Sequence, residues 1–98
     1  MEAAVGRWDN DTNPVAEPGS VRWHVLTLLA QGYEHGYEIW RELVAQGFTQ
    51  SRNPTAVYRA LRAMNQEGLV SSEWEFRTVG PARRVYRLTQ RGRRALKE

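Results

Sequence analysis

Two segments in the first half of the chain repeat apolar residues at the three- and four-residue spacing of a helix buried on one side. The first spans residues 20–30, with Ser20 as a suitable N-cap and Gly32 just beyond its end. Its predicted core stripe consists of Val21, Val25, Leu28 and Leu29. The second spans residues 36–46 and ends at Gly47. Its predicted buried side consists of Ile39, Trp40, Leu43 and Val44.

A third helix, predicted over residues 53–67, has an apolar side and a cationic side. Asn53 can cap its start, and Pro54 suits the first helical position because its missing N–H costs nothing there. The apolar stripe consists of Val57, Leu61 and Met64. The polar stripe consists of Thr55, Arg59, Arg62 and Gln66. Since residues three and four apart share a helix face, we expect the cationic side to point away from the core.

After Gly68 the pattern changes to the two-residue alternation of strands. Residues 70–76 predict a half-buried strand, in which Val70, Ser72, Trp74 and Phe76 share one face. Residues 78–81 predict a turn, and residues 83–88 predict a second strand with Tyr86 and Leu88 on one face. Thr89 can then cap a final, arginine-rich helix that runs to about residue 97.

The order of helix, helix, helix, strand, strand and helix predicts a mainly α fold with a small β-hairpin wing (α+β). This is the layout of a winged helix-turn-helix, which we place at residues 20–98. Residues 1–19 are polar and have no clear period, so a flexible N-terminal arm is expected there.

Charge is distributed unevenly along the 98 residues. Residues 1–51 hold three basic and seven acidic side chains, a balance of −4, whereas residues 52–98 hold eleven basic and four acidic ones, a balance of +7. This asymmetry suggests a basic working surface, although a solvated arginine-rich surface would explain it equally well by itself. The absence of cysteine excludes disulfides and cysteine metal sites.

The cationic side of the third helix suits the major groove of B-DNA, which admits one α-helix. Arg59 and Arg62 could each bind guanine with two hydrogen bonds, with Thr55 beside them. The positive end of the helix near Asn53 would favour a phosphate. Tyr58 allows two interpretations: its ring can pack while its hydroxyl reaches a phosphate, or it can be a simple core residue. The competing interpretation of the whole face is an ordinary solvated helix surface.

The hairpin offers a second contact, because a short basic ribbon can reach backbone phosphates or the minor groove. The alternative is a hairpin whose arginines only keep an edge strand soluble. The predicted DNA-binding set from the helix and the hairpin consists of Asn53, Thr55, Tyr58, Arg59, Arg62, Arg77, Arg83 and Arg84.

Four runs of the sequence occur in an order and at a spacing that we recognise. They are His35-Gly36-Tyr37-Glu38-Ile39, Pro54 with Val57-Tyr58-Arg59-Ala60-Leu61, Glu67-Gly68-Leu69-Val70, and residues 80–89 followed by Gly92. Together they resemble the PadR-type transcriptional regulators over roughly residues 20–97. The run over residues 80–89 is especially similar to the branch of polyhydroxybutyrate-responsive repressors.

The resemblance implies a repressor that binds a palindromic operator in double-stranded DNA as a homodimer and is released by a small molecule or a stress signal. An apolar or aromatic effector held between tryptophans such as Trp23, Trp40 and Trp74 is one option. The family's usual Pro-Gly-Thr is replaced here by Pro54-Thr55-Ala56, so operator contacts at that point are expected to differ. The long C-terminal dimerisation helices of the family have no counterpart in the sequence up to Glu98. Dimerisation is therefore expected to use the final helix, the first helix or the N-terminal arm, or else to be weak.

Other functions fit the sequence less well. An enzyme is not expected, because His24 and His35 are the only histidines and no phosphate-binding loop is present, so no cofactor is implied. His35 and Glu38 have the spacing of a metal pair, but a histidine at a helix start explains them better. A winged helix that binds proteins and a sequence-independent nucleic-acid binder both stay open. No apolar run suits a membrane span or a signal peptide, so we expect a cytoplasmic protein.

Overall fold

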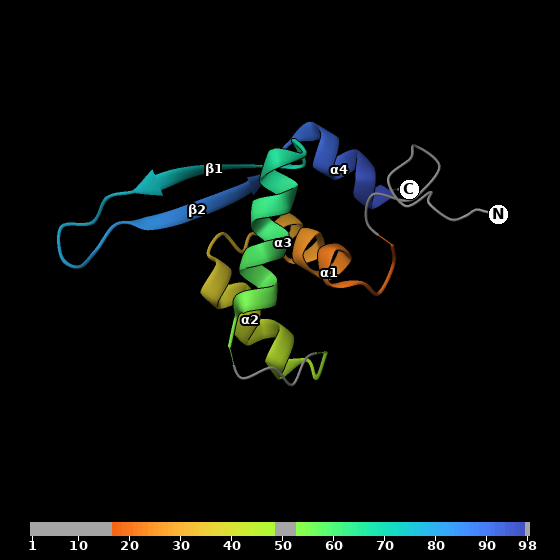
Figure 1. The fold of residues 1–98 in the computed structure, drawn as a ribbon, viewed down its shortest axis with the longest axis horizontal. Coiled ribbons are helices and arrows are strands. Elements are labelled where there is room, and N and C mark those ends of the chain that lie inside the picture. The colour runs from red at the N-terminus through yellow and green to blue at the C-terminus, as the bar shows by residue number, and fades with distance from the viewer. Residues whose placement is uncertain (1–16, 49–52, 98) are drawn as a thin grey trace.

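The computed structural model describes residues 17–48 and 53–97, which form four helices and one two-stranded antiparallel sheet (Figure 1). The helices are α1 (Val21–Ala30), α2 (Gly36–Ala45), α3 (Thr55–Gln66) and α4 (Gln90–Lys97). The strands are β1 (Val70–Glu75) and β2 (Arg83–Leu88). This order confirms the predicted winged helix-turn-helix. The predicted arm over residues 1–19 lies almost wholly outside the described residues, and its boundary stays a prediction.

Two of the helices, α1 and α4, begin at their predicted capping residues. Ser20 Oγ accepts a hydrogen bond from the backbone N–H of Trp23 at 3.1 Å, and Thr89 Oγ1 accepts one from Gly92 at 3.1 Å. At α3, Asn53 Oδ1 accepts the N–H of Thr55 at 3.0 Å. Regular helix starts at Thr55 rather than at the predicted Pro54, whose ψ of 17° departs from helical geometry.

One apolar core joins all the elements, with α1 at its centre in contact with the other three helices and with β2. The fully buried side chains of this core are each worth about 1.5–3 kcal/mol relative to exposure. They include Leu26, Ile39, Leu43, Leu61, Met64 and Leu69. Val44 was predicted to be buried and is 41% exposed instead. The buried stripe of α2 follows Ile39 and Leu43, and Val44 lies a further 100° around the helix.

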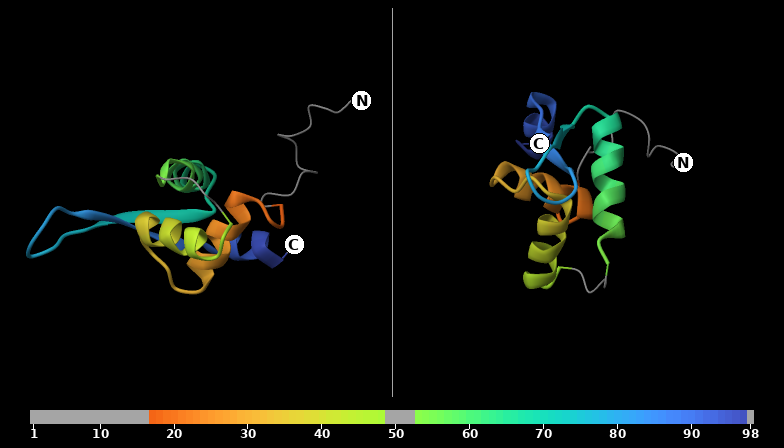
Figure 2. Two further views of the ribbon diagram at one scale, coloured as in Figure 1. Left: turned by 90° about the horizontal axis from the view of Figure 1, so that it is seen from below. Right: turned by 90° about the vertical axis from the view of Figure 1, so that its left-hand side faces the viewer.

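The hairpin projects away from the helical body (Figures 1 and 2). Its register pairs Val70 with Leu88, Ser72 with Tyr86, and Trp74 with Arg84 on one face. The predicted half-buried face is covered only at its base, where Val70 is 2% exposed. Farther out, Trp74 is 54% and Phe76 83% exposed, because the strands extend past the helices. The wing therefore carries side chains that the body does not bury.

Two backbone contacts hold the wing and α4 in place. The N–H of Tyr86 donates to the carbonyl oxygen of Glu34 at 2.9 Å, which ties β2 to the loop before α2. The N–H of Thr89 donates to the carbonyl oxygen of Leu69 at 3.1 Å. Gly92 lies against that same carbonyl, and a Cβ built on Gly92 would stand 2.1 Å from the Leu69 oxygen. The start of α4 is thereby fixed to the start of β1.

Candidate nucleic-acid interface

The outward side of α3 carries the polar stripe that the sequence predicts. Val57, Leu61 and Met64 are buried on the inner side of the helix. Thr55, Arg59, Arg62 and Gln66 are all exposed on the outer side. Within residues 17–48 and 53–97, neither Arg59 nor Arg62 forms an ion pair. Both guanidinium groups are therefore available to an external partner, and each can present several donors in one plane.

The first turn of α3 combines a fold-stabilising residue with accessible ones. The side-chain oxygen of Asn53 accepts a hydrogen bond from the N–H of Thr55, so this atom is already engaged at the start of α3. The hydroxyl of Thr55 belongs to an exposed side chain. Ala56 is exposed as well, so the departure from the family's Pro-Gly-Thr falls on the surface that a groove would meet.

Arg84 is held in position by two residues, Trp74 and Ser72, that the sequence did not indicate for this role. Its guanidinium carbon lies 5.0 Å from the centroid of the Trp74 ring, in a cation–π arrangement. Its NH2 donates to Ser72 Oγ at 3.0 Å. That hydroxyl also accepts a hydrogen bond from Asn65 Nδ2 of α3 at 2.9 Å. Arg84 therefore lies on the face of the wing that is joined to α3.

Arg83 lies on the opposite face of the wing and is already paired. Its NH2 donates to Glu75 Oε1 at 3.0 Å, and His35 Nε2 lies 3.2 Å from the same oxygen. The hydrogen bond from His35, and then that from Arg83, hold the pKa of Glu75 below its ordinary value of 4.5. His35 Nδ1 is 3.3 Å from Glu38 Oε1. Much of the charge on Arg83 is therefore offset within the protein.

Arg77 lies at the exposed tip of the wing. Its guanidinium carbon is 3.6 Å from the position of a Cβ built on Gly80, so the side chain folds back over the turn. Gly80 has a φ of +91°, which favours glycine at this point of the turn. The three predicted wing arginines thus have three different surroundings: the tip, the paired face and the face joined to α3.

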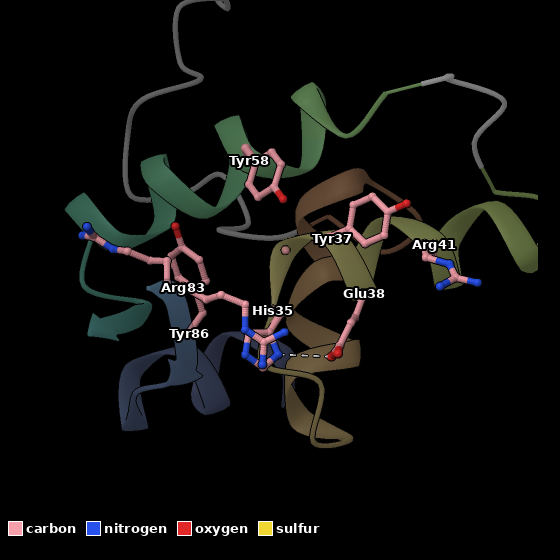
Figure 3. A pocket seen from close by; sticks show the side chains of 9 residues that line it. His35, Tyr37, Glu38, Arg41, Tyr58, Arg83 and Tyr86 are labelled. Carbon is pink, nitrogen blue, oxygen red and sulfur yellow. Dashed lines mark hydrogen bonds and ion pairs between the residues drawn. The ribbon is translucent and has the colours of Figure 1, made fainter. Parts of the chain in front are cut away.

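Tyr58 of α3 lines a pocket of about 340 Å³ (Figure 3). The pocket is formed by the start of α2, by α3 and by β2. Tyr58 is 42% exposed, and its hydroxyl points away from α3 toward Tyr37 (Figure 3). Partial burial, and then the neighbouring Tyr86 and Tyr37, raise the pKa of Tyr58 above its ordinary value of 10.0. Its hydroxyl is therefore protonated near neutral pH and can donate a hydrogen bond.

The pocket is also lined by residues that the sequence did not indicate as site residues, among them Tyr37, Arg41 and Tyr86. Tyr37 and Arg41 are four residues apart and so share one face of α2, which is the signal that could have paired them. Nothing in the local sequence joins them to Tyr86 of β2, because that proximity arises only from the packing of the wing against α2.

The described residues contain no group of three or more His, Cys, Asp or Glu side chains that could hold a metal ion. In the same part of the chain, no helix has both the length and the apolar composition needed to cross a bilayer.

Comparison with known proteins assigns the chain to a family. The sequence profile of the transcriptional regulator PadR-like family matches residues 25–98. The transcriptional regulator Rv3488 of Mycobacterium tuberculosis is 41% identical over 79 residues, which cover 81% of this chain and 71% of that protein.

Solved structures share the fold. A PadR-like transcriptional regulator from Bacillus cereus is 29% identical with a TM-score of 0.68, and the match covers 81% of this chain and 76% of that one. Bacillus subtilis PadR, solved in complex with operator DNA, is 23% identical with a TM-score of 0.69. That match covers 79% of this chain and 44% of PadR, and at this identity it shows the fold alone. The profile match and the mycobacterial relative together establish that this chain belongs to the PadR-like family of transcriptional regulators.

Proposed function

We propose that this protein is a sequence-specific DNA-binding transcriptional regulator that places α3 in the major groove and the wing on the backbone or minor groove. The observation that carries the proposal is the outer side of α3. There, Arg59 and Arg62 are exposed and form no ion pair within residues 17–48 and 53–97. An arginine in that state can bind the O6 and N7 atoms of guanine without breaking an internal contact.

The proposed contacts keep the predicted set and give its members different roles. Arg59, Arg62 and Thr55 face base edges, while Tyr58 and the start of α3 at Asn53 face phosphates. On the wing, the contact set consists of Arg77, Arg83 and Arg84. We give Arg84 the larger share, because Trp74 and Ser72 already fix its position. Arg83 contributes less, since Glu75 offsets its charge.

Family membership supports further proposals about the biological role. We propose repression, a homodimer on a palindromic operator, and a cytoplasmic location. A two-fold dimer would read half-sites about 10 bp apart. The run over residues 80–89 supports a position near the polyhydroxybutyrate-responsive branch. We also propose an apolar or aromatic effector. Trp23 and Trp40 pack against the core, which leaves Trp74 as the more exposed ring for stacking. Because Arg84 lies over Trp74, the effector would have to displace Arg84.

The experiment that tests the proposal is selection of bound duplexes from a random DNA pool by the purified protein. We expect enrichment of a defined motif with two-fold symmetry. Retention of duplexes without an enriched motif would instead indicate sequence-independent binding. Failure to retain duplex at low salt, where phosphate contacts are strongest, would contradict DNA binding and leave the winged helix as a protein-interaction module.

A further inference from the structure

The pocket beside α3 brings together one tyrosine from each of three elements (Figure 3). Tyr37 belongs to α2, Tyr58 to α3 and Tyr86 to β2. We call this site the tyrosine pocket. Figure 3 shows the Tyr58 hydroxyl directed toward α2 and the Tyr86 hydroxyl directed toward α3. Among the described residues, none of the three hydroxyls has a hydrogen-bond partner in the protein. Three uncharged donors are therefore left without internal partners around one cavity of about 340 Å³.

Gly36 leaves the space in which the Tyr58 ring lies against the start of α2. A Cβ built on Gly36 would stand 2.4 Å from Cε1 of Tyr58 and 2.9 Å from its Cδ1. Any larger residue at the start of α2 would push the Tyr58 ring out of its place. The absence of a side chain at Gly36 therefore lets α2 and α3 approach closely enough to share the pocket.

The charges around the tyrosine pocket leave a cationic excess. Its one acidic lining residue, Glu38, lies 3.3 Å from His35, and Glu75, which does not line the pocket, is engaged by both His35 and Arg83. Arg41 forms no ion pair with any residue in the two described ranges. Arg84 is hydrogen-bonded to a neutral hydroxyl and keeps its full charge. Arg83 offsets Glu75, which leaves Glu38 as the one acidic charge against the two arginines, Arg41 and Arg84.

We propose that the tyrosine pocket binds a phosphate group, with the tyrosine hydroxyls as donors and Arg41 and Arg84 as the compensating charges. Phosphate oxygens accept several hydrogen bonds at once, and charge-assisted bonds of this kind are stronger than neutral ones. This inference rests on the proposed function, and the phosphate is then one of the operator backbone. A strand that leaves the groove occupied by α3 and passes under the wing would run across this pocket. The same chemistry would also accept a phosphate carried by a small molecule.

The first test removes hydroxyls but keeps the rings. Tyr37→Phe/Tyr86→Phe should weaken binding of the selected duplex about tenfold or more, as expected for lost hydrogen bonds to a charged group. Tyr33→Phe is the matched control, because Tyr33 does not line the pocket. Arg41→Gln should reduce the slope of log affinity against log salt by about 0.9, the value for one lost phosphate contact. Unchanged affinity in the double variant, with an unchanged slope in Arg41→Gln, would overturn the proposal.

The second test identifies the source of the phosphate. Single backbone phosphates of the selected duplex are replaced in turn by neutral methylphosphonate. Replacement of one flanking phosphate should lower the affinity of the wild type. The same replacement should not lower the affinity of Tyr37→Phe/Tyr86→Phe any further, and a merely structural role would not produce this coupling. Inorganic phosphate is then titrated into the DNA-free protein and followed by the backbone amide signals of residues 36–38. Saturable shifts that disappear in the double variant support a site for free phosphate as well.

The outcomes separate this inference from the proposed function. Coupling without phosphate shifts supports a site for the DNA backbone alone. Saturable phosphate shifts in a protein that retains no duplex would sustain the tyrosine pocket while the proposed function fails. If Arg59→Ala/Arg62→Ala abolishes duplex binding and the tyrosine variants show neither coupling nor phosphate shifts, the proposed function stands and the phosphate pocket is wrong.

Discussion

Gly36 of α2 lies against the edge of the Tyr58 ring, at a distance that excludes even a methyl group between them. This contact links the start of α2 to the outward side of α3, on which the proposed DNA contacts lie. Figure 3 shows Tyr58 above the pocket that the two helices share with β2. The position of one interface residue is therefore set by the absence of a side chain on a neighbouring helix.

Gly36→Ala should displace Tyr58 and lower DNA affinity, while costing about 1–3 kcal/mol of stability from overpacking. The Leu61 side chain, 3.2 Å from the same Cβ position, limits relaxation on the other side. Thermal unfolding and DNA binding would be measured for Gly36→Ala, Tyr58→Ala and the double variant. We expect the stability cost of Gly36→Ala to fall in the Tyr58→Ala background, where only the contact with Leu61 remains. An equal cost in both backgrounds would show that the two residues do not interact.

Gly92→Ala should be more damaging to the fold than Gly36→Ala. The new Cβ would stand 2.1 Å from a backbone carbonyl oxygen, that of Leu69, which cannot rotate away as a side chain can. We expect a loss of about 3 kcal/mol or more, at the upper end of overpacking costs. For a domain of this size, each 1 kcal/mol corresponds to a fall in Tm of about 4–8 °C. Arg93→Ala, on the exposed side of the same helix, is the control and should change Tm little.

Trp74→Ala should affect DNA binding more than stability. Trp74 is more than half exposed, so little burial is lost, but Arg84 loses the ring that holds its guanidinium in place. A cation–π contact at an exposed site is worth about 0.5–1 kcal/mol, which predicts a fall in affinity of a few fold. Phe76→Ala removes a still more exposed ring, over which no arginine of residues 17–48 or 53–97 lies, and serves as the control. Equal effects of the two substitutions would argue against positioning of Arg84 by Trp74.

Glu75→Gln should destabilise the protein in a pH-dependent way. His35 and Arg83 lower the folded-state pKa of Glu75 below 4.5, so its carboxylate contacts stabilise the fold above the unfolded-state value. That contribution is lost as the pH falls through the folded-state pKa. The difference in Tm between wild type and Glu75→Gln is therefore expected to be largest near neutral pH and to close in acid. A difference that stays constant across this range would contradict the assigned contacts.

The sequence predicted the elements well because their ends depend on local chemistry. Ser20 and Thr89 each cap a helix through a hydrogen bond to a residue three positions later, and Asn53 accepts one from the first residue of α3, so these ends can be found from the local sequence. The error at Trp74 has a physical cause. Alternation in a strand shows which side chains share a face, but it does not show how far the neighbouring helices extend to cover that face.

The sequence predicted only those parts of the candidate site that depend on a single helix or strand. The exposure of Arg59 and Arg62 follows from the period of a single helix, so it could be predicted. Arg83 and Arg84 were grouped together, although adjacent residues of a strand point to opposite faces, and the structure gives them different partners. The tyrosine pocket could not be predicted, because its residues come from three elements that only tertiary packing brings together.

The central claim, that the outer side of α3 contacts bases, is tested most directly by comparing two variants of equal charge. Arg59→Ala/Arg62→Ala and Arg93→Ala/Arg94→Ala each remove two exposed arginines, the second pair from α4. Binding of the selected duplex and of random duplex would be measured by fluorescence anisotropy at matched salt. The α3 variant should lose about hundredfold or more in affinity for the selected duplex and lose its preference over random duplex. The α4 variant should keep that preference. If the α3 variant retains both wild-type affinity and wild-type preference, α3 does not read the operator.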